Sequence, residues 1–200
     1  MSTRFSRTVW LAAVLVMVGC QGPGVNGRPS AGKPAAKVEV SRRSANLFAT
    51  AVRAVQEQRF TDAEVLLLEL TTREPDLSGP WVNLGTVYLA LDDSEAAQVA
   101  FRRAVEINPD NCAAYNEMGV MSRQSGDFLT AEANYLACVE RVPDFREAYL
   151  NLGILYELYL GRLPEALAAY RTYQSLLEAP DRRVEGWVMD LERRLKRAES

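Results

Sequence analysis

The 200-residue sequence predicts an all-α fold, a series of antiparallel helical hairpins. Two observations carry this prediction. Proline, alanine, glycine and a bulky apolar residue each recur every 34 residues, a period typical of arrays of helix pairs. Within each copy, the apolar residues have the spacing of one helix face. The recurring residues are Pro75, Pro109 and Pro143; Ala63, Ala97 and Ala131; Gly85, Gly119 and Gly153; and Leu67, Phe101 and Tyr135.

The first segment, residues 1–19, has the pattern of a signal peptide. Arg4 and Arg7 precede an uninterrupted apolar run over residues 9–18. As a helix this run would span about 15 Å, roughly half of a hydrocarbon layer of about 30 Å, so a cleaved signal is favoured over a permanent transmembrane helix.

The signal ends in a motif that resembles the lipobox of bacterial lipoproteins. The residues are Met17-Val18-Gly19-Cys20, with Met17 where leucine is usual. The resemblance implies that Cys20 is lipidated and anchors the chain in a membrane; the alternative is an ordinary secretory signal. Because Gln21 rather than aspartate follows the cysteine, it further implies the periplasmic face of the outer membrane of a Gram-negative bacterium.

Residues 20–43 are expected to form a disordered tether. They are rich in glycine and proline, with almost no large apolar side chain to drive burial. This segment carries five basic residues and one acidic residue, whereas residues 44–200 carry sixteen basic and twenty-five acidic ones. An acidic body argues against binding to nucleic acid, which needs clustered Lys and Arg.

Residues 78–111 form the clearest copy of the repeat. They read Trp81-x-x-Leu84-Gly85-x-x-Tyr88, followed by an alanine, a phenylalanine and a proline at regular spacing. This pattern resembles the consensus of the tetratricopeptide repeat (TPR) family almost position for position. Counted from Ser78, apolar residues stand at positions 4, 7 and 11, and small residues stand at positions 8 and 20, where the two helices cross. The resemblance implies a right-handed superhelix of antiparallel hairpins.

The other repeats keep this frame. Residues 112–145 form a second clear copy, and residues 146–180 form a third that contains one extra residue, which we place in the turn before Pro164. Residues 44–77 fit more weakly and form a divergent first repeat.

The domain is expected to end in a single capping helix, residues 181–198. Its apolar stripe faces the last repeat, and its outward side is polar. Repeats and cap together make one domain, residues 44–198.

The composition argues against an enzyme. The sequence contains no histidine, which removes the commonest general base and metal ligand. No glycine-rich phosphate loop is present, and no serine or cysteine has an obvious activating neighbour. We therefore expect no cofactor, no metal and no small-molecule substrate.

Cys112 and Cys138 occupy positions 1 and 27 of one hairpin. Positions 8 and 20 lie at the same level in the two antiparallel helices. Position 1 is seven residues before position 8 and position 27 is seven residues after position 20, so positions 1 and 27 also lie at the same level. A disulfide between the two is therefore geometrically conceivable, and the oxidising periplasm permits it. The alternative is two small buried thiols.

The resemblance implies that a protein or peptide binds to the concave face, which the first helices line at positions 2, 5, 6, 9, 12 and 13. Asparagines gather there, and a column of amides can bind the backbone of an extended peptide; the alternative is that they contact only water. Arg123 is the only basic residue on this face of the three clear copies, which argues against a clamp for a terminal carboxylate. The expected binding residues are Asn83, Thr86, Asn116, Val120, Arg123, Asn151, Ile154 and Glu157.

The layout of a lipid anchor, a tether and TPR hairpins is similar to that of pilotins, which assist outer-membrane secretin rings in type IV pilus assembly. The resemblance therefore implies a protein partner in the cell envelope. Two alternatives stay open: an accessory of a TonB/ExbB-type transport or motility system, and an adaptor that recruits peptidoglycan hydrolases.

Overall fold

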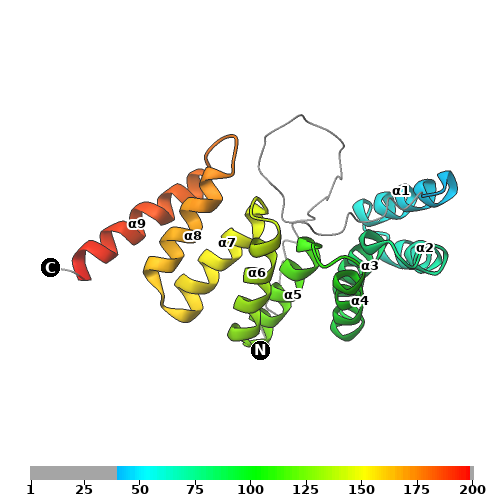
Figure 1. Cartoon of the computed structure of the whole chain (residues 1–200), viewed down its shortest axis with the longest axis horizontal. Helices are drawn as coiled ribbons and strands as arrows, with labels where there is room; N and C mark the ends of the chain where they lie inside the picture. The colour runs from blue at the N-terminus through cyan, green and yellow to red at the C-terminus, as the bar shows by residue number, and fades with distance from the viewer. Residues whose placement is uncertain (1–39, 199–200) are drawn as a thin grey trace, which may run out of the picture. The chain divides into compact units, whose positions relative to one another are not determined.

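The computed structural model describes residues 40–198, and within this range it is helical without strands, which confirms the all-α prediction (Figure 1). The signal peptide, Cys20 and residues 20–39 of the predicted tether lie outside the described residues. In chain order the helices are α1 Arg42–Gln56, α2 Phe60–Arg73, α3 Ser78–Ala90, α4 Ser94–Ile107, α5 Cys112–Ser125, α6 Phe128–Arg141, α7 Arg146–Leu155 with a π-helical turn η1 Tyr156–Leu160, α8 Leu163–Ser175 and α9 Arg182–Ala198.

Consecutive helices pack as hairpins, α1 with α2, α3 with α4, α5 with α6, and α7 with α8 (Figure 1). Each second helix also contacts the first helix of the next pair, so the hairpins stack in chain order. The first helix begins at Arg42, two residues inside the predicted tether, because the Ser41 side chain caps it by accepting a hydrogen bond of 3.0 Å from the Ser44 amide. No helix of the described part is long and apolar enough to cross a membrane.

Short polar residues cap the starts of three helices inside the array, α4, α5 and α6. Asp93, Asn111 and Asp127 each accept a hydrogen bond from the backbone amide three residues later, at 2.9, 3.2 and 3.1 Å. Such caps satisfy amides that have no partner within the helix. The second helices end just before the repeating prolines, which lack the N–H that a continuing helix needs.

A small residue facing a large one sets the approach of the two helices in every hairpin. At Gly85 an added Cβ would lie 2.6 Å from Cε1 of Phe101, and the same ring contact exists between Gly119 and Tyr135 and between Gly153 and Tyr170. In the divergent first repeat the corresponding pair is Ala51 and Leu67, both fully buried. Because the leucine is less bulky than an aromatic ring, this crossing accommodates the extra methyl group of alanine.

The extra residue of the last repeat does not form a looser loop. It continues α7 as the wide turn η1, which closes at Gly161 in the left-handed conformation (φ 64°), with the Arg162 amide bonded to the Tyr156 carbonyl at 2.9 Å. A π-helical turn absorbs one inserted residue without breaking the helix. Its outer side chains, Leu158 and Tyr159, are exposed.

The final helix α9 stands in the position of the first helix of a further repeat. Counted from Asp181, its Val184, Trp187, Val188 and Leu191 occupy the core positions 4, 7, 8 and 11, and α9 packs against α8. Position 8 is Val188 here instead of glycine, because no described second helix follows to place an aromatic ring against it.

Candidate functional site

The eight residues predicted to bind a partner lie on the first helices of three hairpins, α3, α5 and α7 with its extension η1. Of these first helices, α5 contacts α7 directly, as α1 contacts α3, and the second helix α4 packs against both α3 and α5. Equivalent positions of successive repeats therefore form rows that run across the helices. We name the rows by their repeat position.

The position-9 row is the most apolar part of this face. Thr86, Val120 and Ile154 are half-buried, and their equivalent on α9, Met189, is 60% exposed. Val120 and Ile154 pack at their inner side against the core of the last two hairpins. The row therefore exposes apolar surface to a partner, and packing against the core holds the inner side of the row in place.

The predicted column of amides is present only in part, because Asn116 is 5% exposed. Its Oδ1 accepts a hydrogen bond of 2.8 Å from Nδ2 of Asn151, and its Nδ2 donates to Oε1 of Glu117 at 3.4 Å. Burial raises the pKa of the Glu117 carboxyl, against the opposing effect of this hydrogen bond. Asn116 thus holds two first helices together and does not present a free amide, and its predicted role in partner binding stays a prediction.

Asn83 and Thr86 bond to their own helix. Asn83 Nδ2 donates to the Gly79 carbonyl at 3.0 Å, and the Thr86 hydroxyl donates to the Val82 carbonyl at 3.1 Å. Both side chains are half-buried. They lie on the predicted face, and these hydrogen bonds fix the orientation of both side chains before a partner binds.

Arg123 and Glu157, which share position 12, are bound within the chain. Arg123 Nε donates to the Tyr135 hydroxyl at 3.5 Å, and its guanidinium lies 5.7 Å from the ring centre of Tyr159. Glu157 accepts from the Tyr170 hydroxyl at 3.2 Å and pairs with Arg194 of α9 at 2.7 Å. Both residues therefore contribute to contacts between repeats.

A further link between the last two hairpins centres on Glu132 of α6. It accepts a hydrogen bond of 2.9 Å from the Tyr156 hydroxyl and pairs with Arg162 at 2.8 Å. Burial, together with this bond to a carboxylate, raises the pKa of Tyr156 to about 12. The phenol is thus a hydrogen-bond donor throughout the physiological pH range.

The two cysteines of the third hairpin face each other as their register predicts. Cys112 on α5 and Cys138 on α6 are buried and form a disulfide across the hairpin, with their Cα atoms 4.6 Å apart. This distance lies in the range that disulfides require. Their oxidation in the cell stays a prediction.

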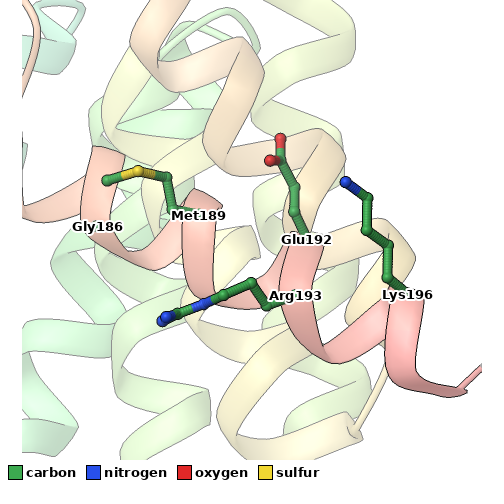
Figure 2. A pocket seen from close by; sticks show the side chains of 5 residues that line it. All are labelled: Gly186, Met189, Glu192, Arg193 and Lys196. Carbon is green, nitrogen blue, oxygen red and sulfur yellow. The ribbon is translucent and has the colours of Figure 1, made fainter.

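A shallow hollow lies on the exposed side of α9 (Figure 2). The side chains of Met189, Glu192, Arg193 and Lys196 project from the helix around it, and Gly186 lies one turn before Met189. An added Cβ at Gly186 would meet no atom within 4 Å, so the missing side chain leaves open space.

Three models of the tetratricopeptide repeat match the chain, at residues 79–111, 100–133 and 123–179. Together they run without a gap from the start of α3 to the end of the last hairpin. The chain belongs to the tetratricopeptide repeat family. TPR domains bind protein partners, so the described hairpins form a scaffold for protein–protein interaction.

Curated relatives share the TPR region only. The chain is 33% identical over 85 residues to a UDP-N-acetylglucosamine–peptide N-acetylglucosaminyltransferase of Giardia intestinalis, a match that covers 42% of this chain and 6% of the relative. It is 34% identical over 166 residues to the protein O-mannosyl-transferase TMTC3 of Mus musculus, with 75% of this chain and 18% of the relative covered. The chain thus spans less than a fifth of the length of either relative.

Solved TPR structures resemble the fold more completely. PilF of Pseudomonas aeruginosa has a TM-score of 0.68 at 16% identity, covering 77% of this chain and 69% of that chain. MamA of Desulfovibrio magneticus has a TM-score of 0.62 at 17% identity, covering 78% and 87%. At these identities the likeness shows the fold alone.

Two features of the TPR array go beyond what the repeat pattern predicts. One is the aromatic contact between Phe128 and Tyr159, with ring centres 4.9 Å apart, which the turn η1 brings about. The other is the binding-face register of α9, which places Met189 and Arg193 at positions 9 and 13. The 35-residue spacing between Arg146 and Asp181 indicates this register, whereas the polar outward side of residues 181–198 predicts only a capping helix.

Proposed function

We propose that this chain is a binding module without catalytic activity, which holds a segment of a partner protein along the first helices of its TPR array. The position-9 row carries this proposal. Thr86, Val120, Ile154 and Met189 place partly exposed, uncharged surface at one level on successive first helices. Such an uncharged and mainly apolar row fits a partner that lies across the helices.

The proposal of no catalysis rests on residue chemistry. The sequence has no histidine, and the charged groups that α5 and the α7–η1 helix place on the face, among them Glu157 and Arg123, are committed to contacts within the chain. The transferase activities that name two relatives are not transferred to this chain, because the similarity covers 18% of their length or less.

We further propose that the module is lipid-anchored through Cys20 to the periplasmic face of the outer membrane, and that it assists the assembly of an envelope machine such as a type IV pilus secretin. The motif at residues 17–20 and the basic, glycine-rich residues 20–39 support the anchor. The fold shared with PilF is compatible with this class of partner.

The anchor is tested by labelling cells with a palmitate analogue and separating the membranes. We expect the wild-type chain to carry the label and to fractionate with the outer membrane, and the Cys20→Ser variant to lose both properties. A wild-type chain that carries no label would refute lipidation.

Partner binding is tested by crosslinking in intact cells followed by capture of the tethered chain. The variant Val120→Lys/Ile154→Lys places two charges on the position-9 row, where lysine stems can still cover apolar surface. The control Val65→Lys/Val99→Lys makes the same change at two exposed valines of the second helices α2 and α4. Circular dichroism melting shows whether each variant is folded.

We expect the first variant to lose its crosslinked partner and the control to keep it. Equal capture by both variants would show that the partner does not bind the position-9 row. Identification of the captured protein as a secretin, as an ExbB-type component or as a peptidoglycan hydrolase separates the proposed machine from the two alternatives.

A further inference from the structure

The binding face does not end at the last full hairpin. Because α9 keeps its core residues in the register of a first helix, its Gly186, Met189 and Arg193 occupy positions 6, 9 and 13 of the same face. The hollow of Figure 2 is lined by these residues together with Glu192 and Lys196. The hollow is therefore the C-terminal part of the face that we assign to partner binding.

The shape of the hollow fits a chain segment better than a small molecule. Its volume of about 450 Å³ is in the range of ligand sites, but the lining residues all come from α9, so no second wall encloses a ligand. A peptide that lies across the first helices needs only such an open surface, and the space over Gly186 admits one of its side chains.

Charge is distributed unevenly along the face. The binding-face positions of α1 and α3 carry no charged residue. In α5 and α7 the charged side chains are engaged within the chain. Glu147 pairs with Arg146 at 3.1 Å and Glu157 with Arg194 at 2.7 Å, the half-buried Glu117 accepts a hydrogen bond from Asn116, and the half-buried Arg123 contacts Tyr135 and Tyr159. The exposed cations of this face that a partner can reach are thus expected towards α9.

The end of α9 supplies these cations. Lys196 forms no ion pair with any described residue. Arg193 pairs with Asp190 at 3.0 Å, but both side chains are well exposed, and such a pair contributes so little that a partner can exchange it. Glu192 is bound to Arg171 at 2.7 Å, and Glu185 lies eleven residues before Lys196, about 16 Å along the helix.

We propose that the partner segment carries apolar side chains that lie along the position-9 row and carboxylates that lie over Arg193 and Lys196. This inference rests on the proposed function. It adds which side chains the bound segment carries and in which orientation the segment lies along the face. The uncharged end over α1 and α3 receives the apolar part, and the basic end of α9 receives the acidic part.

An anionic membrane is a weaker candidate for the same cations. A helix that binds in a bilayer surface combines a basic face with several large apolar residues that insert between lipids. Here Met189 is the only large apolar side chain on the exposed side of α9, and the carboxylates of Glu185 and Glu192 share that side. An acidic peptide meets the two cations without placing these carboxylates against a negative surface.

The test uses the full chain, a random-peptide display library and two matched variants. Arg193→Glu/Lys196→Glu reverses the charge of the hollow. The control Arg102→Glu/Arg103→Glu reverses two exposed arginines on α4, and it also breaks one exposed ion pair three residues apart, Arg103 with Glu106 at 3.0 Å. Both variants change the net charge of the chain equally.

We expect the wild-type chain to select peptides that combine apolar residues with an acidic cluster at one end. Such a peptide, synthesised with a fluorescent label, should bind the hollow variant roughly tenfold more weakly than the wild type, the effect of two exposed charge contacts. The control should bind like the wild type. The tenfold difference should shrink as salt is raised.

Each other outcome has a distinct meaning. Selection of peptides without acidic bias, or equal binding by both variants, overturns the inference and leaves the proposed function standing. Failure to select any peptide counts against both. Binding to vesicles of phosphatidylcholine and phosphatidylglycerol that is lost in the hollow variant alone, without acidic bias in the peptides, assigns the cations to a membrane and also overturns the inference.

Discussion

Nδ2 of Asn151 donates a hydrogen bond of 2.8 Å to Oδ1 of Asn116, although the two residues are 35 positions apart in the chain. They lie on the first helices of adjacent repeats, α7 and α5, and the acceptor is almost completely buried. The bond therefore joins repeats at the level of the binding face. It keeps the helices in register under the surface that a partner would contact.

Replacement of Asn151 by alanine should lower the free energy of unfolding by about 1–2 kcal/mol, because it leaves the buried Asn116 acceptor without its donor. For the loss of this bond Asn116→Ala should cost less, because the half-buried Asn151 amide can still reach water, and the double variant should cost clearly less than the sum of the two. Asn83→Ala is the control, since its amide bonds only within α3. Urea unfolding of the four proteins measures the coupling; additive losses would mean that the bond does not link the repeats.

Two helical glycines should respond oppositely to alanine. At Gly85 the new methyl group would overlap the ring of Phe101, so we expect a loss of about 1–3 kcal/mol. At Gly186 the methyl group meets open space, and the higher helix propensity of alanine should stabilise the chain by about 0.5–1 kcal/mol. Thermal melting of both variants checks the signs, and a destabilised Gly186→Ala would show that the hollow is not open.

The sequence predicts the hairpins well because the signals that define them are local. A glycine facing an aromatic ring at a fixed spacing, and a proline after each second helix, determine where two helices cross and end. The form of the insertion could not be predicted in this way. One extra residue can be absorbed in a loop or in a wide helical turn, and the pattern around Glu157 does not distinguish the two.

The sequence predicts which residues lie on the first helices, but it does not predict which contacts they make within the chain. Val120 and Ile154 lie where the register places them, whereas Asn116 is buried. Asn116 stands at position 5, one residue before the position that Asn83 and Asn151 share. This shift by one position turns the Asn116 side chain towards the neighbouring helix. Whether it then forms a hydrogen bond there depends on the distance between repeats, and the sequence of a single repeat does not determine that distance.

The Cys112–Cys138 disulfide should stabilise the third hairpin. It closes a loop with a sequence separation of 26, for which the chain-entropy model gives about 3 kcal/mol. In a Cys20→Ser background we expect no free thiol in the denatured, unreduced protein and a lower melting temperature after reduction. Cys112→Ala/Cys138→Ala should melt near the reduced protein and be insensitive to reductant. Two reactive thiols before reduction would contradict oxidation in the cell.

The stability of the domain should depend on pH through Glu117. Burial raises the pKa of its carboxyl above the ordinary value of 4.5, so the folded state holds this proton more tightly than the unfolded state does. The resulting stabilisation is complete below pH 4.5 and is lost as the pH rises through the folded-state pKa. Glu117→Gln removes the titration, because a neutral amide takes the place of the carboxyl.

At neutral pH, Glu117→Gln should therefore be more stable than the wild type, and the difference should narrow as the pH falls towards 4.5. Urea unfolding across this range measures the difference. Glu140→Gln, at an exposed position on α6, controls for the loss of one negative charge. A variant less stable than the wild type at neutral pH would mean that the Glu117 carboxylate is stabilised by its contact with Asn116, and that this hydrogen bond outweighs burial.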